Sequence, residues 1–337
     1  MIALSVSDLS LAFGTDVILS DVSFAANDGD KIGIIGVNGA GKTTLFRLIA
    51  GDLSPDNGAV YLQKGHRVGM LEQNPDLSAL PADHTMLDYM YTAFPDLLAW
   101  EEEIARLEDE LIRAPKDDET KISSLSHALD EVRRRYEAEG GSQFRSLSRG
   151  MLLRLGFTEA QLGQKISTLS GGQYTRLALA RLLATEPDIL MLDEPTNHLD
   201  IDALAWLESF LANYKKTVLI ISHDRYFLDR TTTKTLQIQY GHAKLFPGSY
   251  TRAKEAMEEE RAAVEKRYKE QQKEIARIRA NIEFQRRCNQ EHNYVTIRSK
   301  EKQLARMEKI EKLPNDPKSI RLSFSSEDSA GDVLTAK

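Results

Sequence analysis

The stretch KIGIIGVNGAGKTT, residues 31–44, decides the fold class of this chain of 337 residues. It opens with a largely apolar run typical of a strand buried on both faces, and a Gly-rich loop follows at once. The loop, GVNGAGKT, fits the pattern G-x-x-x-x-G-K-[ST] and leads into the helical segment TTLFRLIA. A strand, a glycine loop and a helix in this order predict an α/β core whose loop holds phosphate groups.

The residues of this loop have distinct expected roles. Glycines allow the backbone to curl, so that successive N–H groups converge on phosphate oxygens at the N-terminus of a helix, whose dipole also favours anions. The Lys42 ammonium is expected to hold the β- and γ-phosphates of a nucleotide, and the Thr43 hydroxyl is expected to ligate Mg²⁺. The loop residues predicted to bind the nucleotide are Gly36, Asn38, Gly39, Gly41, Lys42, Thr43 and Thr44.

Two further apolar runs of strand length are followed by polar residues. DILML at residues 188–192 precedes Asp193 and Glu194, and TVLII at residues 217–221 lies just before His223. Open α/β sheets bind ligands beyond the carboxyl ends of their parallel strands, so these side chains are expected near the phosphate loop. Asp193 is then a candidate to orient Mg²⁺, and Glu194 to activate a water. A lone histidine is more often structural, but His223 is placed to reach a γ-phosphate.

Helical periodicity interrupts this α/β pattern. Apolar residues at spacings of three and four predict a helical hairpin over residues 96–113 and 117–138, with Pro115 between the two helices. Strands that alternate with helices then predict an α/β fold with a helical subdomain inserted at about residues 78–165.

A second glycine motif, LSGGQ at residues 169–173, precedes another helical run. We expect residues 150–186 to be helical around it. The motif lies about 130 residues from the phosphate loop, and a second anion site in the same domain would be superfluous. Its simplest role is therefore that of a helix N-cap, with Ser170 as the cap residue.

Charge is unevenly distributed along the chain. The whole sequence has 44 basic and 51 acidic residues, a net charge of −7. Residues 251–312 have 17 Lys or Arg and 12 Asp or Glu, a balance of +5, which leaves −12 for the rest. This segment predicts a helix over about 251–287, a turn and a second helix that ends near 313. A basic hairpin on an acidic body suggests a polyanionic partner, although a solvated coiled-coil spacer would have the same pattern.

Composition limits the class of protein. An apolar fraction of 41% is enough for a proper core, and no apolar run approaches the 18 or more residues of a membrane-spanning helix. The first residues have no features of a secretory signal. The single cysteine, Cys288, cannot form an intramolecular disulfide, which fits a reducing cytosol.

Four segments together resemble the signatures of an ATP-binding cassette (ABC) ATPase, in the family's order: GVNGAGKT, LSGGQ, DILMLDEPTNHLD and ISHDRYFLD. The resemblance implies a P-loop NTPase fold with ATP and Mg²⁺ as ligands. It also implies that the LSGGQ of one cassette closes over ATP held by a partner cassette. The signature residues expected to contact the partner's ATP are Ser170, Gly171, Gly172 and Gln173.

The same resemblance assigns four more positions. Gln73 matches the Q-loop glutamine, which is expected to contribute to Mg²⁺ binding and catalysis. Asp200 matches the D-loop aspartate and His223 the switch histidine. Phe13 matches the aromatic residue that stacks on adenine, although an aromatic near a strand end is more often part of the core.

DEPTNHLD followed by SHDRYFLD, and then a charged helical hairpin, is similar to the F subfamily of these ATPases, which have two cassettes in one chain and no transmembrane domain. The implied domains are a cassette at 1–249, a basic linker at 250–313, and a connector at 314–337 that begins a second cassette. The linker tip would enter the ribosome from the tRNA exit site. The tip residues expected to contact RNA are Arg286, Arg287, Arg298 and Lys300.

The implied reaction is in-line attack on ATP by a water that Glu194 polarises. The charge on the γ-phosphate would be met by Lys42, Mg²⁺, His223 and the partner's signature. A second cassette is missing, so the chain is expected to be part of a longer protein, with the pairing of two copies as the alternative. Its last residues, VLTAK, also echo ALSVS at residues 3–7.

The predicted function is that of a cytoplasmic, ribosome-associated ATPase, with ribosomal RNA and tRNA as partners, that modulates translation or protects it from antibiotics. Three alternatives stay open. The chain could be the ATPase of a transporter whose membrane subunits are separate, or a DNA-associated ATPase. It could also sense ATP without hydrolysing it, although an intact Glu194 and His223 argue against this.

Overall fold

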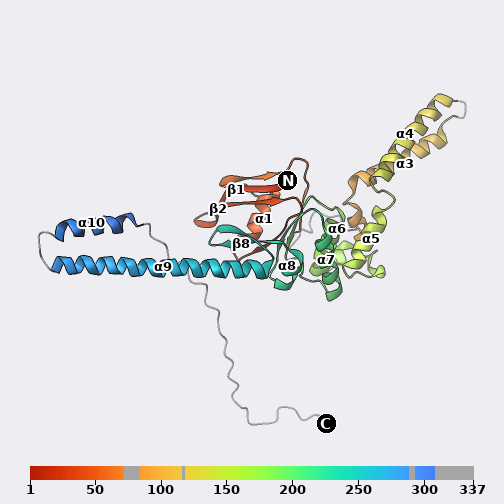
Figure 1. The fold of residues 1–337 in the computed structure, drawn as a ribbon. Helices are drawn as coiled ribbons and strands as arrows, with labels where there is room; N and C mark the ends of the chain where they lie inside the picture. Colours follow the sequence, from red (N-terminus) through yellow and green to blue (C-terminus); the bar gives the residue numbers. More distant parts are fainter. Residues whose placement is uncertain (72–82, 116–117, 288–292, 308–337) are drawn as a thin grey trace, which may run out of the picture. The chain divides into compact units, whose positions relative to one another are not determined.

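A computed structural model describes residues 1–71, 83–115, 118–287 and 293–307 of the chain (Figure 1). Contacts divide the chain into two compact units, Met1–Ala256 and Met257–Lys337. The first unit contains both sheets and nearly all the helices. Among the described residues, no helix is both long and apolar enough to cross a bilayer.

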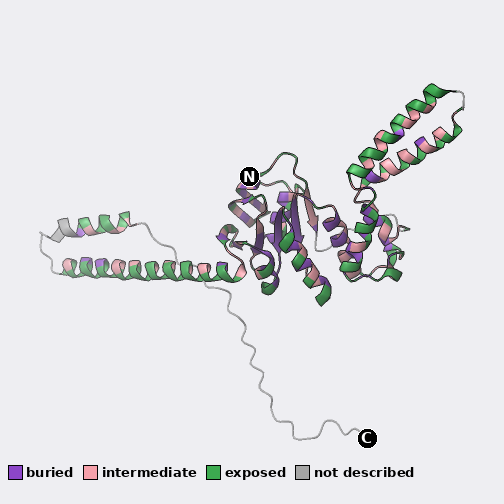
Figure 2. Cartoon of the chain, turned by 45° about the vertical axis from the view of Figure 1, so that its right-hand side comes forward, coloured by how far each residue is buried: buried purple, intermediate pink, exposed green. Residues whose placement is uncertain are grey.

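The centre of the first unit is a six-stranded sheet in the order β5-β6-β7-β3-β8-β9. Its strands are β3 (Lys31–Ile35), β5 (Val68–Leu71), β6 (Ile189–Asp193), β7 (Thr217–Ile221), β8 (Lys234–Gln239) and β9 (His242–Pro247). Neighbouring strands are parallel except for β9, which pairs antiparallel with β8. Every residue of β6 and β7 is buried, which explains their continuous apolar sequence (Figure 2). The strands predicted at 31–36, 188–192 and 217–221 are therefore confirmed, although β3 ends one residue earlier and β6 is shifted by one residue.

A second, antiparallel sheet packs against this core. Its order is β2-β1-β4, formed by β1 (Ile2–Phe13), β2 (Asp16–Asn27) and β4 (Asn57–Leu62). Helix α1 (Lys42–Ala50), which follows the phosphate loop, shares its apolar cluster. Leu45 and Phe46 of α1 are fully buried there, so the apolar face of this helix fixes the loop at its N-terminus.

The remaining helices of the first unit are α2 (Met86–Tyr91), α3 (Pro95–Arg113), α4 (Glu119–Ala138), α5 (Phe144–Arg154), α6 (Gly171–Ala184), α7 (Ile201–Asn213) and α8 (Arg225–Thr231). α3 and α4 form the predicted helical hairpin, which Figure 1 shows as a separate arm. At its base the Glu101 carboxylate accepts hydrogen bonds from Tyr136 (2.7 Å) and Arg145 (2.5 Å).

The prediction that residues 150–186 are helical is wrong for the middle of this range. α5 ends at Arg154, and Gly156 has a left-handed backbone with φ +84°, which ends the helix. Two short 3₁₀ turns follow, at Glu159–Gln161 and Ile166–Thr168, before α6 begins. Local apolar spacing continued through the break, so periodicity alone did not reveal it.

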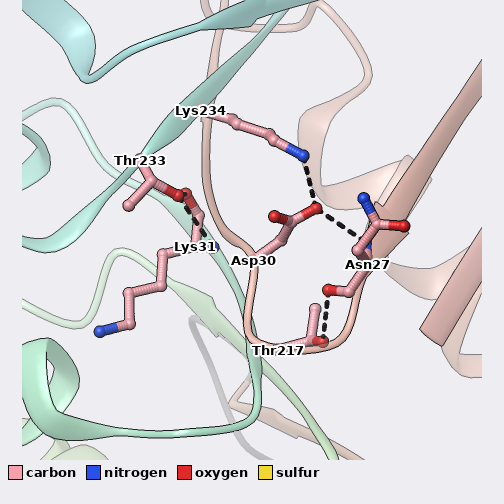
Figure 3. A network of polar contacts seen from close by, with 6 residues as sticks. All are labelled: Asn27, Asp30, Lys31, Thr217, Thr233 and Lys234. Carbon is pink, nitrogen blue, oxygen red and sulfur yellow. Dashed lines mark hydrogen bonds and ion pairs between the residues drawn. The ribbon is translucent and has the colours of Figure 1, made fainter. Parts of the chain in front are cut away.

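A polar network ties together the amino ends of the central strands (Figure 3). One oxygen of Asp30 accepts hydrogen bonds from the Lys234 ammonium and from the Asn27 N–H, each at 2.7 Å. The Thr217 hydroxyl donates to the Asn27 carbonyl at 3.1 Å. Because these residues precede β3, β7 and β8 or begin them, the network lies at the end of the sheet opposite to the phosphate loop.

The second unit is built on α9 (Tyr250–Arg287), which begins in the first unit, and on α10 (Asn293–Arg306). Ile278, Ile282 and Ile297 form a small buried cluster between the two helices. α9 confirms the helix predicted over 251–287. The turn was predicted over 288–293, of which only Asn293 is described, and this residue already begins α10. The end of the second helix after 307 and the expected connector at 314–337 lie outside the described residues.

Candidate nucleotide site

The carboxyl ends of β3, β6 and β7 surround a cleft of about 700 Å³, a size that suits a nucleotide. It is lined by Ile18, Asn38, Gly39, Gly41, Lys42, Thr43, Thr44, Asp193, Glu194, Asn197, Ile221 and His223. Three separate strand ends thus contribute the residues that the sequence predicted. Ile18 and Asn197 were missed, because an aliphatic residue in a strand and an amide in a loop have no distinctive pattern.

The phosphate loop has the geometry that its glycines allow. Gly41 has φ +95° and a side chain there would contact Ile18 of β2, and a Cβ on Gly36 would lie 2.6 Å from the Ile238 carbonyl oxygen. The buried Lys42 ammonium donates to the carbonyls of Gly36 (2.8 Å) and Val37 (3.1 Å). Burial lowers the pKa of Lys42, and the carboxylates across the cleft partly oppose this. This cation is available to a phosphate group at little desolvation cost.

Two oxygen ligands suited to Mg²⁺ meet in the cleft. The Thr43 hydroxyl at the start of α1 donates to Asp193 Oδ2, at the end of β6, at 2.7 Å. Burial raises the pKa of Asp193, so a nearby cation would favour its charged form. Among the described residues no three acidic, histidine or cysteine side chains group to hold a metal. Two oxygen donors fit Mg²⁺, which usually takes one or two protein ligands together with substrate phosphates. Gln73 lies outside the described residues.

Glu194 and His223 face each other across the same cleft. His223 Nε2 lies 3.6 Å from Glu194 Oε1, and this buried carboxylate oxygen has no hydrogen-bond partner among the described residues. The backbone of Glu194 is left-handed, with φ +50°, an uncommon conformation for a non-glycine residue. Burial raises the pKa of the Glu194 carboxyl, and His223 partly opposes this. A desolvated carboxylate on a strained backbone, with one oxygen that forms no hydrogen bond among the described residues, has the features of a general base.

Comparison with known proteins places this chain in a family. A family model described as ABC transporter matches residues 19–197, which is more than half of the chain, and a second model of the same description matches 236–324. The chain is an ATP-binding cassette protein of the F subfamily. A solved ATP-binding subunit of an ABC transporter has the same fold, with 19% identity and a TM-score of 0.52 over 73% of this chain and 90% of the other.

Three curated relatives illustrate the range of this family. ABC transporter F family member 5 of Arabidopsis thaliana is 32% identical over 93% of this chain and 45% of its own length. The energy-dependent translational throttle protein EttA of Mycobacterium tuberculosis is 32% identical over 90% and 52%. The tylosin resistance ATP-binding protein TlrC of Streptomyces fradiae is 36% identical over 82% and 50%. The chain spans about half the length of the curated relatives it matches.

The cassette signature forms the predicted helix cap and does not line the cleft of its own chain. Ser170 Oγ accepts the Gln173 N–H at 3.3 Å, and Gln173 Oε1 accepts the Ser170 N–H at 2.9 Å, so the two residues form a capping box at the start of α6. A Cβ on Gly172 would lie 3.0 Å from the His198 ring. Asp200 caps α7 by accepting the Ala203 N–H at 2.8 Å. Their contact with a partner's ATP stays a prediction.

Phe13 and the linker residues also stay predictions. Phe13 is 54% exposed at the end of β1 and does not line the cleft. In the linker, Arg286 pairs with Glu301 at 2.6 Å, and the Lys300 ammonium donates to Asn281 at 2.5 Å. The other two residues expected to contact RNA, Arg287 and Arg298, are exposed. Two of the four cations therefore help to hold α9 and α10 together.

Proposed function

We propose that this ABC cassette binds ATP with Mg²⁺ and hydrolyses it, and that the cycle of binding and hydrolysis acts on the ribosome through the helical linker. The observation that carries the ATPase part is the cleft itself. Lys42, the pair of Thr43 and Asp193, and the pair of Glu194 and His223 come from different parts of the chain, and all of them line one cleft.

Each side chain has a task in this proposal. Lys42 leaves the loop carbonyls and binds the β- and γ-phosphates. Thr43 and Asp193, with Gln73, hold Mg²⁺, which supplies positive charge to the phosphate oxygens when it is bound. The Glu194 carboxylate orients and deprotonates the attacking water, and His223 contacts the γ-phosphate. The exposed Phe13 ring stacks on the adenine.

A second cassette completes the site. ABC cassettes work in pairs, and the signature of this chain lies away from its own cleft. Ser170, Gly171, Gly172 and Gln173 then close over ATP held by the partner, and Asp200 contacts the shared interface. The partner is a second cassette in the same full-length protein, or a second copy of this chain.

The ribosomal part of the proposal rests on the relatives and on charge. EttA is described as a translational throttle and TlrC as a tylosin resistance protein. The linker of this chain presents exposed Arg287 and Arg298. We propose that it contacts ribosomal RNA and tRNA at the tRNA exit site, in the cytoplasm. DNA and a membrane subunit are the alternative partners.

The test is co-sedimentation of the full-length Glu194→Gln protein with ribosomes. With ATP this variant should stay bound, because its hydrolysis is blocked, whereas the wild type should cycle off. ATP turnover at the wild-type rate in the variant would refute the role of Glu194. If the variant loses ATP turnover but does not bind ribosomes, the ATPase part of the proposal stands and the ribosomal part is refuted. Growth on tylosin separates a resistance role from general translation control.

A further inference from the structure

Helix α8 lies directly after the switch histidine and is rigidly held. Asp224 caps it by accepting the Phe227 N–H at 3.1 Å, and the Asp224 N–H donates to Ser222 at 3.1 Å, so His223 sits inside a hydrogen-bonded turn. The side chains of Phe227 and Leu228 are buried in the core, with 0% and 1% of their surface exposed. α8 is therefore a rigid element that would move as one body, because its close packing leaves the helix no room to deform.

Both ends of α8 contact the start of the linker helix α9, which lies next to α8 in Figure 1. Asp229 Oδ1 accepts the Thr251 backbone N–H at 2.8 Å, and Oδ2 accepts the Thr251 hydroxyl at 2.5 Å. The Arg225 guanidinium lies over the Tyr250 ring, 5.6 Å from its centroid. These residues belong to the same compact unit, which extends to Ala256.

The charge on Asp229 suits this position. α9 has 38 residues and no acidic residue in its first turn, so a carboxylate from α8 meets the unpaired N–H groups and the positive end of its dipole. Burial alone would raise the pKa of Asp229, but the hydrogen bonds from Thr251 and Ser249 together outweigh it and hold the pKa below its ordinary value. Asp229 is therefore charged at neutral pH.

We propose that α8 couples the γ-phosphate contact of His223 to the orientation of α9, with Asp229 as the positioning residue. This inference rests on the proposed ATP site. When His223 moves onto the γ-phosphate, α8 shifts and carries the first turn of α9 with it. Coupling of this kind is reciprocal, so a partner that holds α9 in the shifted orientation tightens ATP binding by the same factor.

The test measures the orientation of α9 with and without ATP in the full-length protein. Spin labels are attached at Asp52→Cys in the cassette and Glu270→Cys in α9, both exposed, after Cys288 is replaced by serine. The parent also contains Glu194→Gln, so that ATP is not consumed. Asp229→Ala removes both hydrogen bonds to Thr251, whereas Thr251→Val removes only the bond from its hydroxyl. Asp96→Ala is the matched control, because it removes an exposed carboxylate from the first turn of another helix, α3.

In the parent and in Asp96→Ala, ATP should shift the distance distribution between the labels. In Asp229→Ala the ATP-dependent shift should be largely lost, and in Thr251→Val it should be reduced but still present. A role limited to stability would lower the Tm but leave the shift in place, and that result would overturn the proposal. So would a parent that binds ATP without any shift.

ATP binding is measured separately with a fluorescent ATP analogue. A parent that fails to bind the analogue refutes the proposed ATP site, and the coupling with it. If the parent and Asp229→Ala both bind the analogue and show equal ATP-dependent shifts in label distance, the coupling is refuted and the proposed ATP site stands.

Discussion

Replacement of Asp30 by alanine should destabilise the cassette without changing its affinity for ATP. Asp30 is the centre of the network in Figure 3, where one carboxylate oxygen accepts hydrogen bonds from Lys234 and from the Asn27 backbone. The side chains of Asp30 and Lys234 are 15% and 29% exposed. Alanine would leave a half-buried ammonium and a backbone N–H without their acceptor.

The expected loss follows from these two bonds. A bond to a charged group contributes about 1.5–3 kcal/mol, and an unmet N–H costs about 1 kcal/mol or more. Water can still reach part of Lys234, so we expect a total of about 2–4 kcal/mol. For a domain of this size this lowers the Tm by about 5–15 °C. Asp30→Asn keeps an acceptor for Asn27 and should lose about half as much.

Urea unfolding followed by circular dichroism measures the loss as a change in the midpoint at constant slope. The affinity for a fluorescent ATP analogue should be unchanged, because Asp30 lies at the amino ends of the strands and the cleft lies at their carboxyl ends. A stability loss below about 0.5 kcal/mol, within the range of ordinary surface substitutions, would refute the reasoning. Equal losses in Asp30→Ala and Asp30→Asn would show that charge dominates the network.

Three further predictions concern the site and the linker. Hydrolysis should decline on the acid side with a midpoint above 4.5, because burial raises the pKa of Glu194 and a general base must be deprotonated; a pH–rate profile that stays flat down to 4.5 would contradict this. Gly36→Ala should cost about 1–3 kcal/mol in thermal unfolding and weaken ATP binding, because its Cβ would lie 2.6 Å from the Ile238 carbonyl oxygen; full ATP affinity would argue against this contact. Arg287→Gln and Arg298→Gln should each reduce the salt dependence of ribosome binding by about one phosphate contact, and an unchanged slope would exclude RNA contact at that residue.

Much of the fold could be predicted because its signals are local. The strands β6 and β7 are continuous apolar runs, since both faces of the parallel sheet are covered, and the phosphate loop has a fixed pattern of glycines. The break between α5 and α6 could not be predicted in this way. Gly156 ends the helix through its backbone conformation, while the apolar spacing around it continues.

Most of the residues that line the cleft could be named from the sequence, but their contacts could not. Thr43 and Asp193 are 150 positions apart, and only the sheet order places their oxygens at 2.7 Å. Ile18 of the other sheet leaves no room for a side chain at position 41, a packing constraint that no motif encodes. For the signature residues a contact could be predicted, because the cap that Ser170 forms is local in sequence. Their proposed contact with ATP involves another cassette.

The length of α9 has a mechanical consequence. Its 38 residues, at 1.5 Å each, span about 57 Å from Tyr250 to Arg287. A helix held at one end acts as a pointer, so a tilt of about 5° at Tyr250 displaces Arg287 by about 5 Å, the rise of one helical turn. A movement too small to disturb the packing of the cassette is thus enlarged, at the far end, to the scale of a side chain.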